Sequence, residues 1–404
     1  MPPTKKELVL AFLVLLTVPV LTELAFRLAR VQFEPQLYIP DVDRGWSLRP
    51  GAEGVITGEN KQFVRINLHG FRDQERSYEK PADTVRIAVL GNSWTEALQV
   101  PLEKTYSLLL QTELNDDGCY AGKHVEVLNF GVAGYSTGQE LLTLQKEVWK
   151  YQPDEIIVAL YPARDIANNV KELNNAANPE QSPYFVYQGT ALILDDAFRL
   201  TPALRPEHIS LQKFSYDVNS HVRLLQSISA LQRAGKTRLA MSIAKERAAR
   251  SGLDNLEYAI YTEPKQADMQ MAWSVTEGLL VAIRNEVRAH AVALRIVNLP
   301  TRPQLIPDSA RRRELMQKLG VTDLSYAENR LTALALKEGI LITNLSLSLS
   351  SYAETHNVYL NGFNSKSFGT GHWNETGHRL AAAAIAADLC PGTDIAAVQA
   401  QTEH

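Results

Sequence analysis

Five short runs rich in Val, Ile and Leu constrain the fold more than any other feature of this sequence. They occupy residues 85–90, 125–129, 155–160, 294–299 and 340–344. Helical periodicity appears between and after them, at residues 105–114, 137–150, 273–290, 327–337 and 375–389. This alternation is typical of strands that are buried on both faces and covered by crossover helices. The sequence therefore predicts an α/β chain with a flavodoxin-like, doubly wound, five-stranded parallel sheet.

A long insertion, residues 171–268, follows the third predicted strand. Within it, residues 184–194 predict a β-hairpin that turns at Gln188 and Gly189, and residues 220–231 predict a helix. Ligands bind such sheets beyond the carboxyl ends of the strands, where this insertion begins. An insertion of this length at that edge favours a lid or substrate platform over a free loop.

The chain begins with a candidate membrane anchor. Lys5 and Lys6 precede an apolar run over residues 8–26, close to the roughly 20 residues that a helix needs to cross hydrocarbon. A cleaved secretory signal is the alternative, but no small-x-small cleavage site appears before Arg27 and Arg30. We expect the helix to be retained as a signal anchor.

These features divide the chain into four segments. Residues 1–28 are the anchor, and residues 29–83 form a linker and N-terminal extension that packs on the domain without a core of its own. The main domain spans residues 84–390. We expect the last segment, residues 391–404, to be a flexible tail.

Charge and cysteine content exclude several classes of partner. The formal net charge of -4 leaves no basic excess to neutralise a phosphate backbone, so nucleic acid is not an expected partner. The two cysteines and nine histidines show no metal-ligand spacing. The sequence therefore predicts neither a metal nor a cofactor.

Candidate catalytic side chains follow the first and last strands. Ser93 comes directly after the first strand, where a nucleophile could lie, although a serine here could also merely cap the next segment. Glycines at the end of the second strand, including Gly134, would let backbone N–H groups approach an oxyanion. His372 lies in the loop before the last helix and could abstract a proton from Ser93. We expect His378, one turn into that helix, to be structural.

These motifs resemble those of the SGNH/GDSL hydrolases, in particular bacterial membrane-anchored members, over about residues 62–390. Gly91-Asn92-Ser93 is similar to the family's Gly-Asp-Ser block, which implies that Ser93 is the nucleophile. Gly134 matches the glycine that helps to bind the oxyanion, and His372 matches the catalytic histidine. The resemblance implies the SGNH hydrolase fold with an N-terminal transmembrane helix.

The chain departs from the family pattern at the third block, where the family carries an Asn-Asp pair. Here Arg164 and Asp165 take those positions. A guanidinium can donate to an oxyanion. Alternatively, Asp165 could hold Arg164 away from the site and leave Asn168 or Asn169 as the donor.

A second departure concerns the acid that orients the catalytic histidine. The positions where the family carries this aspartate are Gly369 and Thr370, and no acid occurs between Glu354 and Glu375. A backbone carbonyl or an acid from elsewhere in the fold would have to orient the imidazole. We therefore expect a Ser-His dyad.

The resemblance implies a serine esterase or deacylase on the cytoplasmic membrane of a bacterium, single-pass and with its domain outside the cytoplasm. Its expected substrates are O-acyl groups of an envelope carbohydrate or a lipid ester. An acyltransferase that uses the same site is one alternative. A catalytically silent binding or scaffold protein is the other, because the orienting acid is missing.

The two cysteines test both the predicted sheet topology and the predicted extracytoplasmic location of the domain. In a flavodoxin-like sheet the first and last helices lie side by side, and Cys119 and Cys390 follow these helices. They could therefore meet and form a disulfide, although two unrelated thiols remain the alternative. Only an oxidising compartment would maintain the bond.

Overall fold

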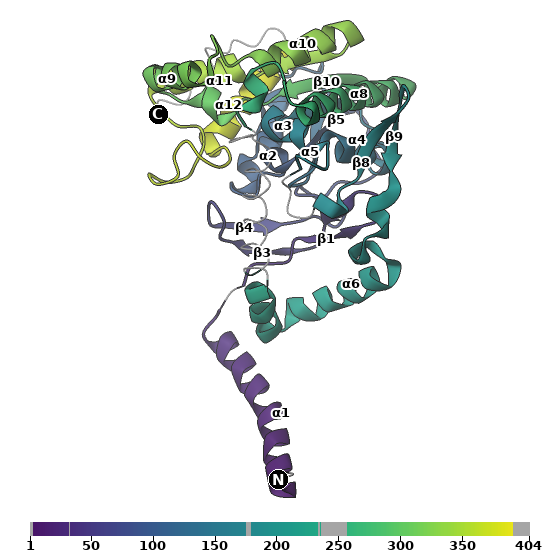
Figure 1. Ribbon diagram of the computed structural model, residues 1–404, viewed down its shortest axis with the longest axis vertical. Helices are drawn as coiled ribbons and strands as arrows, with labels where there is room; N and C mark the ends of the chain where they lie inside the picture. The colour runs from purple at the N-terminus through teal and green to yellow at the C-terminus, as the bar shows by residue number, and fades with distance from the viewer. Residues whose placement is uncertain (1–2, 32, 175–178, 233–234, 236–256, 391–404) are drawn as a thin grey trace.

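The central element is a five-stranded parallel sheet with strand order β11-β10-β7-β5-β6 (Figure 1). The computed structural model describes residues 3–31, 33–174, 179–232, 235 and 257–390. The strands are β5 (Thr84–Gly91), β6 (His124–Gly131), β7 (Glu155–Leu160), β10 (Ala293–Asn298) and β11 (Leu341–Asn344). This order is the flavodoxin-like one, so the predicted fold class is confirmed.

Helices cover both faces of the sheet, as the crossover connections require. One face carries α3 (Tyr106–Asp116) and α12 (Glu375–Leu389), which pack against each other. The other carries α4 (Thr137–Lys146), α8 (Ala267–Ala289) and α10 (Tyr326–Glu338). Every residue of β5 is buried, as expected for a central strand covered on both faces.

The predicted segments agree with the observed ones except at their ends, and four α-helices that the structure describes outside the insertion were not predicted. The segment at residues 137–150 is not one helix, because α4 ends at Lys146 and a 3₁₀ turn follows at Val148–Tyr151. The four α-helices that were not predicted are the short α2 (Ser93–Glu96) and α5 (Pro162–Asn168), and the longer α9 (Ser309–Leu319) and α11 (Ser346–His356). No residue of α9 is fully buried, and of its residues only Met316 and Leu319 pack against the main core, so its apolar stripe is too short to reveal it in the sequence.

The N-terminal extension folds into two antiparallel hairpins. One consists of β1 (Tyr38–Asp41) and β2 (Gly45–Leu48), and the other of β3 (Glu53–Ile56) and β4 (Gln62–Arg65). The apolar side chains of the extension pack together with Val132 and Tyr135 of the main domain. They build a second hydrophobic cluster against the main domain, made of Leu37, Trp46, Leu48, Ala52, Val64, Ile66, Val132 and Tyr135.

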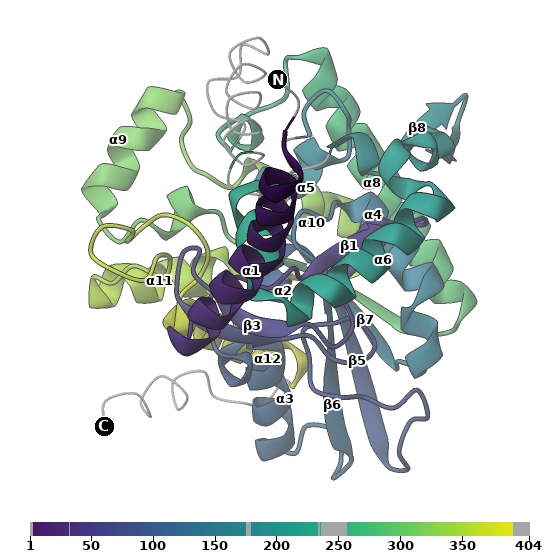
Figure 2. The same cartoon turned by 90° about the horizontal axis from the view of Figure 1, so that it is seen from below.

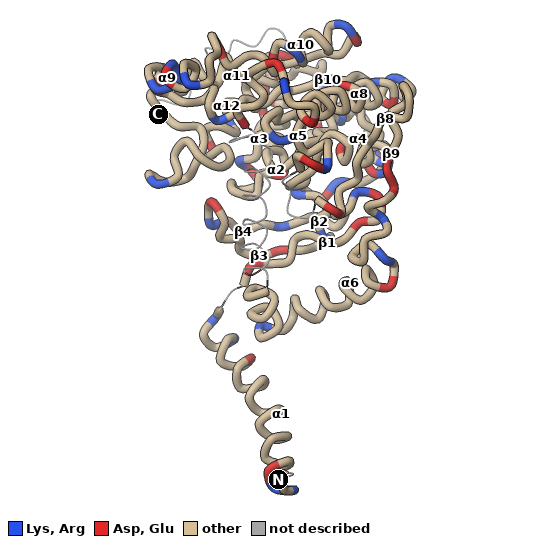
Figure 3. Tube along the Cα trace, in the orientation of Figure 1, with Lys and Arg blue, Asp and Glu red and all other residues tan. Residues whose placement is uncertain are grey.

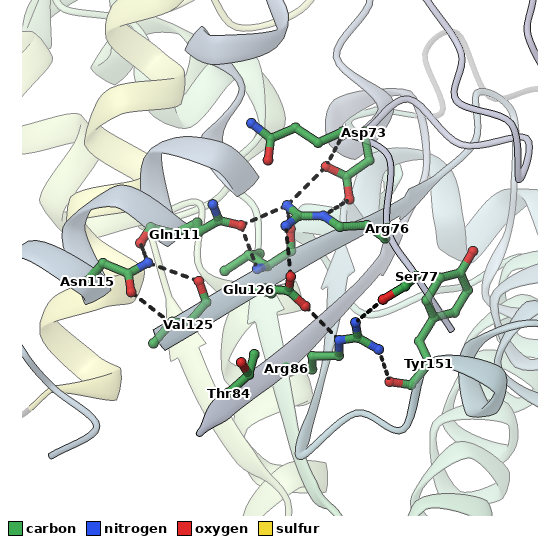
Figure 4. Close-up of polar contacts among 12 residues, drawn as sticks. Asp73, Arg76, Ser77, Thr84, Arg86, Gln111, Asn115, Val125, Glu126 and Tyr151 are labelled. Carbon is green, nitrogen blue, oxygen red and sulfur yellow. Dashed lines mark hydrogen bonds and ion pairs between the residues drawn. The ribbon is translucent and has the colours of Figure 1, made fainter. Parts of the chain in front are cut away.

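A buried polar network joins the end of this extension to the central sheet (Figure 4). Arg86 of β5 is fully buried and forms a 2.7 Å ion pair with Glu126 of β6. Arg76 of the extension contacts Asp73 at 3.3 Å and Glu126 at 3.7 Å. Gln111 of α3 accepts a 2.7 Å hydrogen bond from Arg76. The extension is therefore fixed to the sheet by buried charges that all have partners.

The insertion after β7 contains both predicted secondary structures among its described residues. The hairpin consists of β8 (Tyr184–Gln188) and β9 (Ala191–Asp195), and it turns at residues 189–190, one residue later than predicted. Two helices follow, α6 (Pro206–His221) and a helix at residues 223–232. Part of the predicted lid and the whole predicted tail lie outside the described residues.

Helix α1 (Lys5–Leu28) is the one helix among the described residues that is long and apolar enough to cross a membrane. Its mean hydropathy is 2.4, and no residue of its apolar window is buried. Figure 3 shows α1 without charged residues along its middle and with charged residues near both ends.

A disulfide joins Cys119 and Cys390, with 5.4 Å between their Cα atoms. Cys119 follows α3 and Cys390 directly follows α12. Because these two helices are neighbours on one face of the sheet, the chain segments that follow them meet at one edge.

Candidate active site

Ser93 is the first residue of a short helix, α2 (Ser93–Glu96), that begins where β5 ends. The side chain of Asn92 caps this helix by accepting a hydrogen bond of 2.9 Å from the Trp94 N–H. α2 lies so close to β6 that a Cβ atom at Gly131 would overlap the backbone of Glu96. Gly131 thus allows the helix to approach the sheet and does not itself line the cavity around Ser93.

Arg72, from the N-terminal extension, holds the other end of α2. Its buried guanidinium donates to the carbonyl groups of Glu96 at 3.0 Å and Val100 at 2.5 Å, and also to that of Ala97. These carbonyl groups follow the last turn of α2, where helical partners are missing. The extension therefore helps to position the element that carries Ser93.

Ser93 and His372 form a hydrogen-bonded pair. The distance between Ser93 Oγ and His372 Nε2 is 2.8 Å, although the two residues are 279 positions apart in the sequence. His372 lies in the loop before α12, as predicted. This distance lets Nε2 accept the hydroxyl proton of Ser93 directly.

The imidazole is oriented by an acid that the sequence analysis missed. Glu59, in the loop between β3 and β4, accepts a hydrogen bond of 2.8 Å from His372 Nδ1 and one of 2.7 Å from its backbone N–H. Since Nε2 must accept from Ser93, Nδ1 carries the proton and donates it to Glu59. Gln99 Nε2 lies 3.2 Å from the same Nδ1, but in this tautomer it cannot donate to that nitrogen. The expected dyad is therefore wrong, and the site contains Ser93, His372 and Glu59.

The environment of Glu59 favours its carboxylate form. Partial burial raises the pKa of Glu59, but the hydrogen bonds from His372 and the nearby positive charges lower it by more, so the net pKa lies below its usual value. The carboxylate is 36% exposed, in contrast to a fully buried triad acid. Glu59 therefore remains ionised near neutral pH and can stabilise a protonated His372.

His378 has a structural role, as expected. It is buried, and its Nδ1 accepts a hydrogen bond of 3.3 Å from the Tyr106 N–H. Burial, together with the charges of Arg72 and His372, lowers the pKa of His378 to about 3. The ring is therefore neutral and fastens α12 to α3.

A cavity of about 290 Å³ surrounds the Ser93 hydroxyl. Its walls include two of the predicted oxyanion donors, Gly134 and Arg164, and also Asn168, the first of the two alternative donors. Gly134 has φ +82°, a conformation that glycine adopts without strain. Arg164 and Asn168 both belong to α5 (Pro162–Asn168). Their side chains can donate hydrogen bonds to an oxygen that binds in this cavity.

The second alternative donor, Asn169, lies elsewhere. Its side-chain oxygen accepts a 3.2 Å hydrogen bond from the Gly138 N–H, and its amide group donates to Thr276 at 2.8 Å. These contacts fasten α5 to α4 and α8. Asn169 is not among the residues that line the cavity.

Asp165 contacts Asn92 and the N-terminal end of α5 at the base of the site. Its carboxylate accepts hydrogen bonds of 2.6 Å from Asn92 Nδ2 and 2.6 Å from the Tyr161 N–H. Burial raises the pKa of Asp165, and burial beside Asp165 raises that of Glu140 well above its usual value. We expect the buried carboxyl groups of Asp165 and Glu140 to retain at least one proton between them. Together they then carry at most one negative charge next to Asn92.

The described residues contain no group of three or more His, Cys, Asp or Glu side chains that could hold a metal ion. The reacting groups that are present suit a different chemistry. A serine hydroxyl, a hydrogen-bonded imidazole and an oriented carboxylate can transfer an acyl group through a covalent intermediate.

Comparisons with known proteins give matches among solved structures alone: no family model and no curated protein matches the chain. An acetyl xylan esterase, AlAXEase, is 13% identical, with 74% of this chain and 98% of that chain covered and a TM-score of 0.38. A putative lipolytic protein of the G-D-S-L family from Desulfitobacterium hafniense DCB-2 is 11% identical, with 75% of this chain and 98% of that chain covered and a TM-score of 0.34. The lipase/acylhydrolase from Enterococcus faecalis is 13% identical, with 76% of this chain and 96% of that chain covered and a TM-score of 0.38. These scores are low, so the fold and the site rest on the chain's own topology and contacts.

Proposed function

We propose that this protein is a membrane-anchored serine esterase or deacylase that acts through an acyl-enzyme on Ser93. The observation that carries the proposal is the chain of two 2.8 Å contacts from Ser93 Oγ through His372 to Glu59. The orienting acid removes the main reason to consider a catalytically silent protein. The proposed substrates are O-acyl groups of an envelope carbohydrate or a lipid ester.

The proposed reaction has two acyl transfers. Ser93 Oγ attacks the ester carbonyl while its proton passes to His372 Nε2, and Gly134 with Arg164 or Asn168 stabilises the oxyanion. His372 then gives its proton to the departing alcohol, and the acyl group remains on Ser93. In the second transfer, His372 Nε2 takes a proton from water as the water oxygen attacks the acyl carbon. It then gives this proton to Ser93 Oγ as the bond between the acyl carbon and Oγ breaks, which releases the acid and restores the Ser93 hydroxyl.

Glu59 acts as a positioning residue in this scheme. It keeps the Nδ1–H tautomer of His372 and stabilises the imidazolium that forms in each transfer. It does not contact the substrate carbonyl. Its position outside the main domain makes the site depend on the folded N-terminal extension.

The proposed location is the cytoplasmic membrane, with the domain on the outer side. Helix α1 supports the anchor by its length and composition. The Cys119–Cys390 disulfide supports an oxidising compartment, because cytoplasmic thiols are kept reduced. Together they favour a single-pass protein with an extracytoplasmic domain.

Hydrolysis of short-chain acyl esters by the full-length protein in detergent tests the activity. Ser93→Ala and His372→Ala should each abolish hydrolysis without changing the thermal unfolding temperature by more than a few degrees. Wild-type rates in either variant would refute the assignment. Addition of a sugar acceptor, followed by mass spectrometry of the products, separates hydrolysis from acyl transfer.

A further inference from the structure

An exposed apolar stripe runs along α6, the first helix after the insertion's β-hairpin. Leu211 is 66% exposed, Phe214 is 70% exposed and Val218 is 37% exposed. Their spacing of three and four residues places them on one face of the helix. Large apolar side chains that are exposed together in this way mark an interaction surface.

The opposite side of α6 faces the protein. Gln212 and Tyr216 line a cavity of about 670 Å³ between α6 and the N-terminal hairpins. Asn219 lines the neighbouring cavity of about 520 Å³. At 3.6 residues per turn, these three residues point about 130° away from the apolar stripe around the helix axis. The stripe therefore points away from the domain.

The helix at residues 223–232 also carries exposed apolar side chains, on the side opposite Arg223, Gln226 and Ser229, which line the same cavity as Asn219. Leu225, Ile228 and Leu231 recur at intervals of three residues and are 37%, 44% and 75% exposed. The two helices together form what we call the apolar helix pair, residues 206–232. Its exposed apolar residues are Leu211, Phe214, Val218, Leu225, Ile228 and Leu231.

The apolar helix pair contacts the domain-side end of α1. Arg27 donates a hydrogen bond of 2.6 Å to the carbonyl of His221, the last residue of α6. Glu23 accepts one of 2.9 Å from the Leu224 N–H at the start of the next helix. Figures 1 and 2 show the end of α6 beside this end of α1, and Figure 1 shows α6 at a large angle to α1.

These contacts fix the depth of the pair relative to a membrane that α1 spans. Basic residues at the end of a membrane-spanning helix lie at the level of the lipid head groups. Arg27 lies in the last turn of α1 and Arg30 follows the helix by two residues, and Arg27 donates a hydrogen bond to the last residue of α6. An apolar helix at this level and at a large angle to the span has the geometry of an interfacial helix.

We propose that the apolar helix pair is a membrane-surface element whose occupant is the lipid bilayer around α1. Its apolar side chains enter the boundary between head groups and acyl chains, and its inner side supports the hairpins. This proposal rests on the proposed anchoring by α1, but not on the reaction at Ser93. It fixes the orientation of the domain, so that the hairpin carrying Glu59 lies between the sheet and the membrane.

Fluorescence quenching in lipid vesicles tests this orientation with the full-length protein. Single cysteines are introduced as L211C and F214C, with the native disulfide left oxidised, and are labelled with an environment-sensitive fluorophore. The vesicles contain phosphatidylcholine and phosphatidylglycerol with nitroxide-labelled acyl chains. The control is L336C, because Leu336 is 76% exposed and belongs to α10, which lies at the end of the molecule away from α1 (Figure 1). A second control, L15C, reports insertion of α1.

The proposal predicts quenching at positions 211 and 214 at least about twofold stronger than at position 336, and strongest with nitroxides near the head groups. Quenching at position 15 should be strongest with deep nitroxides. Quenching at positions 211 and 214 that is no stronger than at position 336 would overturn the proposal. This holds also if the probes at 211 and 214 are shielded from lipid by protein, because the proposal requires them to contact lipid. If position 15 is not quenched either, the anchor fails as well. Ester hydrolysis by the same labelled variants reports the proposed function separately, and it should equal that of the wild type.

Discussion

Glu59 is the residue whose role differs most from expectation. Its carboxylate contacts both Nδ1 and the backbone N–H of His372, although the two residues are 313 positions apart. A search near His372 cannot find such an acid, because the usual position lies two or three residues before the histidine. One sequence feature could have indicated Glu59. It lies in a short loop between two extended segments, and no acid occurs at the usual position just before His372.

Replacing Glu59 should slow catalysis with little effect on substrate binding. Glu59→Gln removes the negative charge and one acceptor, so we expect kcat to fall by between about 10² and 10⁴ while KM changes little. Steady-state ester hydrolysis measures both constants. Glu59→Asp should recover part of the rate, since it restores the charge at a shorter reach.

The matched control for this change is Glu53→Gln in the same hairpin. Glu53 is 58% exposed and contacts Arg65 at 3.9 Å on the surface. Its replacement should leave kcat unchanged. Equal losses in the two variants would show that Glu59 acts through the stability of the hairpin and not through His372.

Arg164 and Asn168 line the same cavity as Ser93, and the sequence left open which of them donates to the oxyanion. If the guanidinium stabilises the oxyanion, Arg164→Ala should lower kcat by about 10² with a small change in KM. The comparison variant is Asn168→Ala, measured under the same conditions. An unchanged kcat for Arg164→Ala, with a loss for Asn168→Ala, would assign the role to Asn168.

At the scale of elements, the loop before α12 and the β3–β4 loop depend on each other. Gly371 has φ +67°, and a Cβ atom at this position would overlap the carboxylate of Glu59. Gly371→Ala should therefore displace Glu59 and reduce kcat nearly as much as Glu59→Gln does. The double variant should lose little more than either single variant, because both changes break the same contact.

Gly369→Ala provides the control for backbone strain. Gly369 has φ +79° in the same loop, but its Cβ atom would meet the Tyr359 ring instead of Glu59. Both alanines cost roughly 1 kcal/mol in this conformation. A similar loss of activity in the two variants would contradict the specific role of Gly371.

The strands were predictable from the sequence, whereas the contacts between distant elements were not. β5, β7 and β10 are short, doubly buried and rich in Val, Ile and Leu, so composition alone distinguishes them. Ser93 and His372 were predictable because parallel strands bring their carboxyl ends to one edge. Glu59 belongs to an extension of short, half-exposed strands, and the closure of that extension over the sheet depends on packing at Trp46 and Tyr135 that no local pattern encodes.

For the whole molecule, the disulfide closes a loop between residues 271 positions apart. In the chain-entropy model a loop of this length stabilises the native state by about 5 kcal/mol. The double variant Cys119→Ser/Cys390→Ser should therefore lower the free energy of unfolding by up to that amount, as measured by denaturant titration in detergent. Ester hydrolysis at low temperature should persist, because both cysteines lie away from Ser93.

The Cys119–Cys390 disulfide also tests whether the domain lies in an oxidising compartment. Cysteines of protein taken from intact cells should not react with a thiol reagent until a reductant is added, if the domain lies outside the cytoplasm. Reaction of both thiols without a reductant would contradict the extracytoplasmic placement. The serine site would be unaffected by that result.

The central claim is that Ser93 is activated by His372 and Glu59, and covalent labelling by a fluorophosphonate tests it most directly. This probe needs an activated serine but no knowledge of the substrate. The account predicts a label on Ser93 in the full-length protein, no label in Ser93→Ala, and labelling slowed by several orders of magnitude in His372→Ala. Failure of the folded wild-type protein to label, or a label that persists in Ser93→Ala, would contradict it.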